Sequence, residues 1–153
     1  MDEPGVTDWV PINFAATNTM DAAIARLRET GSVRPDILVI GGVAPVPAGV
    51  APPPAKLYQS VRKHGRTTLH TVGVIMDLSA RIKVRYGTRI ATFDNQLGIV
   101  GAGGPFSSGG DSGSLIMDGV TREPVGLLFA GGGTMTFANP IGPILAHFNV
   151  RIL

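Results

Sequence analysis

The residues with the clearest chemical potential lie in a loop of small side chains, Phe106-Ser107-Ser108-Gly109-Gly110-Asp111-Ser112-Gly113, followed by an apolar run. A nucleophilic serine needs a hydroxyl exposed at a tight turn and backbone N–H groups aimed at the oxygen of the attacked carbonyl. Glycines allow such a turn, and here they favour convergence of the N–H groups of Gly110 and Ser112. The loop therefore indicates nucleophilic chemistry at Ser112, with an ordinary Gly-Asp-Ser-Gly turn as the alternative.

Other residue types that carry chemistry form no comparable cluster. The glycine-rich stretch 101–104 lacks the lysine and the helix that follow a phosphate-binding loop, so we predict a simple turn there. The three histidines (His64, His70 and His147) occur in a chain without cysteine, which argues against zinc. We therefore expect no metal, no cofactor and no disulfide.

Length and composition limit the class of protein. The chain has 153 residues, the length of one domain, and its 21 Gly and 12 Pro argue against an all-helical bundle. Hydrophobic residues make up 44% and charged residues 16%, which excludes overall disorder. No apolar run could span a bilayer, and no basic-then-apolar leader follows Met1, so we expect neither a membrane partner nor a visible secretory signal. A chain without cysteine fits both the cytoplasm and a bacterial secreted protein, so the compartment stays open.

The basic residues form two clusters, although the net charge is only +2. Arg81, Lys83 and Arg85 alternate along the chain and so share one face of a strand. We interpret them as a solvated face and expect no nucleic-acid partner, because a nucleic-acid groove needs more excess charge and interleaved aromatic residues. A nucleic-acid-binding barrel that uses these residues together with Arg62, Lys63 and Arg66 is the weaker alternative.

A proline-rich linker at residues 44–55 divides a front segment, residues 1–43, from a back segment, residues 56–153. The back segment ends in a helix, for which we predict Asn139 as N-cap, Pro140 as first residue, and an apolar face. Residues 20–27 fit either an alanine-rich helix or a strand. Short runs bounded by turn formers precede the terminal helix and predict an antiparallel all-β barrel or sandwich: Leu57–Arg62, Thr68–Met76, Arg81–Tyr86, Arg89–Phe93, Leu97–Val100, Ser114–Met117, Val125–Ala130 and Thr134–Ala138.

Three motifs in order resemble one protein family. They are Trp9-Val10-Pro11-Ile12-Asn13-Phe14 with Asn18-Thr19-Met20-Asp21-Ala22-Ala23-Ile24-Ala25, then Val61-Arg62-Lys63-His64-Gly65-Arg66-Thr67-Thr68, then Gly110-Asp111-Ser112-Gly113 with Pro124-Val125-Gly126-Leu127. Together they resemble trypsin-like (chymotrypsin-fold) bacterial serine endopeptidases, over most of residues 9–150. The resemblance implies a chymotrypsin-type C-terminal β-barrel in residues 56–153 with a terminal helix, and a partial N-terminal barrel in residues 1–43.

The resemblance also implies roles for individual residues. Ser112 is the nucleophile, Gly110 and Ser112 supply the oxyanion-hole N–H groups, and Asp21 is the carboxylate that orients a histidine and precedes a strand. A helix-cap carboxylate is the alternative for Asp21. The substrate-binding residues are Phe106 and Ser107 at the primary pocket and Phe129, Ala130 and Gly131 along the edge that pairs with an extended peptide. Position 106 holds Phe and not an acidic residue, so we expect no preference for Arg or Lys in the substrate. A small or apolar substrate residue is expected instead.

The sequence departs from the family at the histidine. The family's histidine lies upstream of the aspartate, whereas the first histidine here is His64, and we interpret His64, His70 and His147 as surface or barrel residues. We expect the chain alone to be inactive, because a serine hydroxyl without an adjacent base is a poor nucleophile. Two functions remain open. One is a serine endopeptidase that acts on peptides or proteins, with its histidine supplied by an upstream segment or a second chain. The other is a non-catalytic protease-fold module that binds peptides or proteins.

Overall fold

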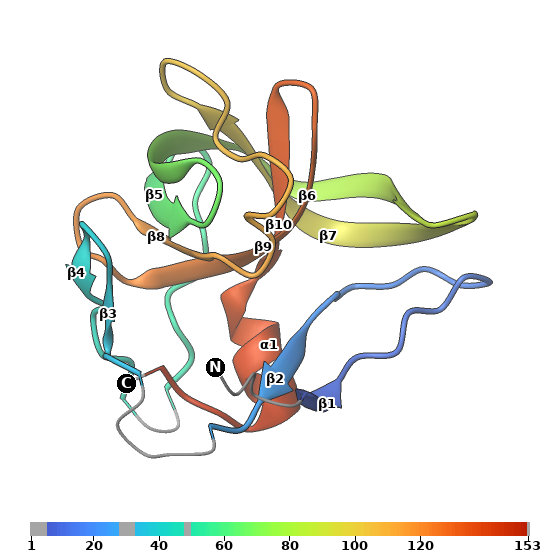
Figure 1. Cartoon of the computed structure of the whole chain (residues 1–153), viewed down its shortest axis with the longest axis horizontal. Coiled ribbons are helices and arrows are strands. Elements are labelled where there is room, and N and C mark those ends of the chain that lie inside the picture. Colours follow the sequence, from blue (N-terminus) through green and yellow to red (C-terminus); the bar gives the residue numbers. More distant parts are fainter. Residues whose placement is uncertain (1–5, 28–32, 48–49, 153) are drawn as a thin grey trace.

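The computed structural model describes residues 6–27, 33–47 and 50–152 of the chain. Six strands between residues 60 and 140 close into a barrel in the order β10-β7-β6-β5-β8-β9, and every neighbouring pair is antiparallel (Figure 1). This confirms the predicted all-β fold. The barrel strands are β5 (Ser60–Gly65), β6 (Leu69–Tyr86), β7 (Arg89–Gly101), β8 (Leu115–Asp118), β9 (Pro124–Gly132) and β10 (Met135–Pro140).

Two barrel strands are longer than the sequence predicts. Four of the predicted strands are in fact two, because β6 and β7 run through the polar positions that we interpreted as breaks. The register between them shifts at Ile75/Asp77, at Asp77/Ala80 and at Ala80/Ile82. Bulges of this kind bend a strand without ending it. The turn-forming residues at 77–79 and 94–95 therefore lie at bends of this hairpin, whereas Gly87 lies at its turn.

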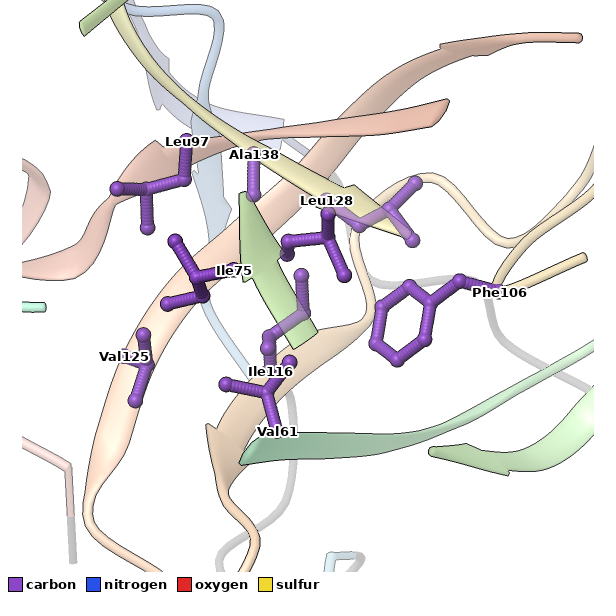
Figure 2. Close-up of a cluster of buried hydrophobic side chains, with 9 residues drawn as sticks. Val61, Ile75, Leu97, Phe106, Ile116, Val125, Leu128 and Ala138 are labelled. Carbon is purple, nitrogen blue, oxygen red and sulfur yellow. The ribbon is translucent and has the colours of Figure 1, made fainter. Parts of the chain in front are cut away.

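The barrel interior is filled by alternate residues of the strands. Nine buried apolar side chains form one cluster, of which eight are labelled in Figure 2. In β5 the buried positions are Val61, Lys63 and Gly65, so the strand's period of two carries one lysine into the interior. The cluster consists of Val61, Ile75, Leu97, Ile99, Phe106, Ile116, Val125, Leu128 and Ala138.

The front segment contributes two small antiparallel sheets. β1 (Val6–Trp9) pairs with β2 (Ala23–Ala25), and β3 (Asp36–Ile37) pairs with β4 (Gly41–Gly42). Residues 20–27 thus contain a strand and not a helix. Residues 1–5 and 28–32 of the predicted front segment, and 48–49 of the predicted linker, lie outside the described residues, and the rest of the linker belongs to no helix or strand. No described helix is long and apolar enough to cross a membrane.

The C-terminal helix α1 (Ile141–Phe148) forms as predicted, but its cap differs. The N-cap is Pro140 in an extended conformation, and no side chain caps the helix. Asn139 is buried instead. Its Oδ1 accepts a hydrogen bond from the Asp21 N–H at 2.7 Å, and its Nδ2 donates to Gln96 Oε1 at 2.9 Å. The Asn139 side chain therefore ties the front segment to the barrel.

The distal part of the β6–β7 hairpin, residues 80–93, projects from the barrel as a two-stranded ribbon that we call the arm (Figure 1). The loop between β1 and β2 runs alongside it, and Asn18 bridges to Phe93. The Phe14 ring meets the Tyr86 ring edge-on at 6.0 Å, and the Arg89 guanidinium lies 3.6 Å from the Phe14 ring centre. The tip of the arm is thus fixed to the front segment.

Candidate active site

The loop that carries Ser112 is a sequence of tight turns. The Asp111 N–H donates to the Ser108 carbonyl at 3.1 Å, and Gly110, the third residue of that turn, has φ +99°. A positive φ at the third position is what a type II turn requires. The Gly113 N–H then donates to the Leu128 carbonyl at 2.7 Å, which returns the chain to the barrel. Ser112 is exposed at the top of this loop.

The backbone N–H groups of Gly110 and Ser112 differ from those around them. Asp111, Gly113 and Ser114 each donate a backbone hydrogen bond within the loop or to β9. In the described part of the chain, neither the Gly110 N–H nor the Ser112 N–H has an acceptor. Two free donors on either side of one residue are available to an incoming oxygen.

Asp111 fixes the loop from beneath. Its carboxylate is fully buried and accepts hydrogen bonds from the N–H groups of Thr67, Thr68 and Ser108 at 2.7, 3.2 and 3.0 Å, and from the Thr68 hydroxyl at 2.7 Å. Burial raises the pKa of this carboxyl, but the hydrogen bonds from Thr68, Ser108 and Thr67 outweigh it and hold the pKa well below its usual range. The turn between β5 and β6 therefore clamps the nucleophile loop.

Lys63 is a member of this cluster that the sequence interpretation missed. Its side chain is 0% exposed, and its Nζ lies 3.6 Å from Asp111 Oδ2 and donates to Thr68 Oγ1 at 2.5 Å and to the Leu69 carbonyl at 3.2 Å. Burial lowers the pKa of the Lys63 amine, and the Asp111 carboxylate opposes that shift. The sequence signal for its burial was the spacing, because Lys63 lies two residues from Val61 and from Gly65 and so shares their face of the strand.

Ser112 opens onto a cleft of about 860 Å³, which we call the main cleft. Its hydroxyl donates a long hydrogen bond, 3.4 Å, to the Phe129 carbonyl. Ser107 also lines the main cleft, and its Oγ lies 2.6 Å from Thr136 Oγ1. Further lining comes from β9, including Phe129, Ala130 and Gly131, and from the arm at residues 82–85. Ser112 and four of the five residues expected to bind substrate therefore share one cavity.

Phe106 is the exception among those five residues. It is 1% exposed and belongs to the buried apolar cluster, where its ring points into the barrel interior (Figure 2). It is not among the residues that line the main cleft. An aromatic ring gains more free energy in the core than at a polar cleft wall, so Ser107 faces the cleft and Phe106 faces inward.

Asp21 lies in the front segment, two residues before β2. A helix-cap role is therefore excluded. Its carboxylate accepts a hydrogen bond from the Tyr86 hydroxyl at the tip of the arm. Asp21 does not line the main cleft, nor does it line a second cavity that Ser112 also borders and that is described below. The structure thus gathers Ser112, Gly110 and Ser107 around one loop and gives Asp21 a phenol as its partner.

In the described residues, none of the three histidines is bonded to the serine hydroxyl. His64 on β5 faces His70 on β6 across the ladder, and His147 packs its ring against Phe148 in α1. His64 lines a second cavity, of about 410 Å³, that Ser112 also borders. Within the described residues, no hydrogen bond joins an imidazole to Ser112. The Ser112 hydroxyl is bonded to the Phe129 carbonyl instead.

Because of the Tyr86–Asp21 bond, we expect the free energy of unfolding to fall as the pH becomes alkaline. Burial and the Asp21 carboxylate raise the pKa of the Tyr86 phenol. A raised pKa stabilises the fold below the unfolded value, about 10, and that contribution is lost as pH rises above it. We expect Tyr86→Phe to lower the free energy of unfolding by about 1–2 kcal/mol at neutral pH and by less at about pH 11, as measured by urea unfolding. A pH-independent difference between the two proteins would contradict this bond.

The comparisons with known proteins identify the fold. No family model matches the chain, and no curated protein matches it. Thermobifida fusca protease A matches with a TM-score of 0.68 and 24% identity, over 89% of this chain and 69% of the protease. The Nocardiopsis protease matches with a TM-score of 0.63 and 23% identity, over 90% and 70%. Cellulomonas bogoriensis chymotrypsin matches with a TM-score of 0.57 and 24% identity, over 90% and 72%. The chain therefore has the chymotrypsin fold that its motifs imply.

Proposed function

We propose that this chain is the nucleophile-bearing part of a serine endopeptidase. The observation that carries the proposal is the loop around Ser112, with an exposed hydroxyl, a type II turn at Gly110 and two unbonded N–H groups beside a cleft. The fold supports it, because the structural neighbours are bacterial serine proteases. About three tenths of each of those proteases lies outside the match.

The proposed reaction uses these groups in turn. Ser112 Oγ bonds to the carbonyl carbon of a peptide while its proton passes to a base, and the carbonyl oxygen, now negative, accepts hydrogen bonds from the Gly110 and Ser112 N–H groups. The C–N bond then breaks, the amine leaves with the proton, and water later hydrolyses the ester on Ser112. The base is a histidine supplied by an upstream segment or a second chain, and Asp21 orients it through the carboxylate oxygen that Tyr86 does not use.

The substrate lies along β9. Beyond Leu128, that strand pairs only with β10 in the described structure, so the edge at Ala130 and Gly131 is open to an added strand. Ser107 lines the cleft without charge, and its hydroxyl is bonded to the buried Thr136, which favours a small or apolar residue next to the bond that is cleaved.

A second candidate is a non-catalytic module that binds peptides in the same cleft. The observation that favours it is the Asp21 carboxylate, which is bonded to the Tyr86 hydroxyl instead of an imidazole. In this function the cleft and the β9 edge would hold a peptide, and Ser112 would contribute only a hydrogen bond.

Labelling by a fluorophosphonate, with added imidazole as a surrogate base, separates the two functions. We expect slow labelling of the chain alone, faster labelling as imidazole is added, and none in Ser112→Ala. Ser79→Ala, which removes an exposed hydroxyl elsewhere, serves as the matched control and should label like the unmodified chain. Absence of imidazole-dependent labelling at Ser112 would reject the endopeptidase, and peptide binding by the same sample would then favour the non-catalytic module.

A further inference from the structure

The arm contributes four consecutive residues, 82–85, to the lining of the main cleft. Lys83 and Arg85 are exposed and alternate with the half-buried Ile82 and Val84, so the cleft borders on two cations of the arm. No aspartate or glutamate is among the described residues that line it. A cleft walled by one sign of charge attracts ligands of the opposite sign.

The two cations also lack partners on their own element. Arg81 belongs to the same row on the arm, and its guanidinium pairs with Asp94 at 3.3 Å. Lys83 and Arg85 stand opposite Thr92 and Ile90 in the ladder, and within the described residues no carboxylate forms an ion pair with either. Their charges are therefore available to a ligand, whereas the charge of Arg81 is already paired.

The contacts of the arm hold in place the strand that carries these cations. Between residues 80 and 86, β6 pairs with β7 alone, and its other edge is unpaired in the described structure. The tip is fixed by Tyr86 to Asp21 and by Arg89 to the Phe14 ring. Because the strand is anchored, binding a ligand here does not carry the entropic cost of ordering a mobile loop.

From these observations we infer that the main cleft binds peptides that carry acidic side chains in the segment lying along β9. Lys83 and Arg85 form ion pairs with those side chains. The inference rests on the proposed cleft for peptides, but it does not require Ser112 to react. The open edge of β9 offers backbone N–H and C=O groups that match another peptide backbone. This favours an acidic peptide over a nucleic acid as the anionic ligand.

The inference is tested by fluorescence anisotropy with two labelled octapeptides. The two peptides are identical except that each glutamate of the first is a glutamine in the second. We expect the 153-residue chain to bind the Glu peptide about three- to tenfold more tightly at about 50 mM salt, and the preference to shrink at about 300 mM salt. The double variant Lys83→Gln/Arg85→Gln should lose the preference. Arg81→Gln, which removes one charge from the same row, should keep it.

Equal binding of the two peptides, or a preference that survives in the double variant, overturns the inference. Labelling of Ser112 is a separate measurement and is not affected by this result. A preference without Ser112 labelling rejects the endopeptidase and keeps the acidic-peptide cleft. An oligonucleotide that binds more tightly than the Glu peptide, and loses this in the double variant, overturns the inference in favour of nucleic acid.

Discussion

Asp111→Ala is expected to lower the free energy of unfolding by about 3–5 kcal/mol, because it leaves the Lys63 ammonium buried at 0% exposure without its carboxylate. That is a large part of the roughly 5–15 kcal/mol that stabilises a typical domain. Urea unfolding followed by the fluorescence of Trp9, the single tryptophan, measures the change. If Asp111→Ala does not fold, Asp111→Asn, which keeps the shape of the side chain, provides the same test.

Asp118→Asn is the matched control for this prediction. Burial raises the pKa of the Asp118 carboxyl, and hydrogen bonds from Thr121, Gln59 and Val120 outweigh it, so the pKa is lowered as it is at Asp111. Asp118 has no ammonium beside it in the described structure, so we expect its loss to cost only about 1 kcal/mol. Replacing both charges, as Lys63→Met/Asp111→Asn, should restore part of the stability. Similar costs at Asp111 and Asp118 would show that the loss at Asp111 does not come mainly from the buried ion pair.

Gly110→Ala is expected to slow the imidazole-assisted labelling of Ser112 by about a hundredfold. At φ +99° an alanine strains the backbone, and its Cβ would lie 2.6 Å from Thr67 Oγ1 and 2.8 Å from Arg66 Nη2. We expect the turn to relax from this conformation together with those side chains, which moves the Gly110 N–H. We also expect a loss of about 1–3 kcal/mol in stability from backbone strain. Labelling at the original rate would show that the Gly110 N–H does not assist the reaction.

Gly103→Ala separates backbone strain from the effect on the site. Gly103 has a similar φ, +88°, but a Cβ there meets nothing within 4 Å. This variant should lose stability without slowing the labelling of Ser112. Equal slowing in both variants would point to general loosening of the loop between β7 and β8.

Local patterns were enough to predict antiparallel strands and a tight turn at Ser112, whereas the choice of a barrel over a sandwich came from the family resemblance. Alternation in Arg81–Tyr86 and the glycines around Ser112 depend on short-range geometry, which a sequence displays directly. Lys63 was misread because a lysine is normally solvated, and only the burial of its strand neighbours places it inside. The Tyr86–Asp21 bond spans 65 positions and the Asn139–Asp21 bond spans 118, so neither leaves a local signal. This is why the cap prediction for Asn139 was wrong: its side chain is suited to cap the nearby helix, but it accepts a hydrogen bond from the distant backbone of Asp21 instead.

The partners of Asp111 have a kinetic consequence under the proposed function. All of them (Lys63, Thr67, Thr68 and Ser108) belong to the barrel or its own turns, and none comes from the front segment. A donor of the histidine therefore meets a serine loop that is already formed. Activity in a mixture should rise hyperbolically with donor concentration, without a lag, and its half-maximum should equal the dissociation constant of the pair.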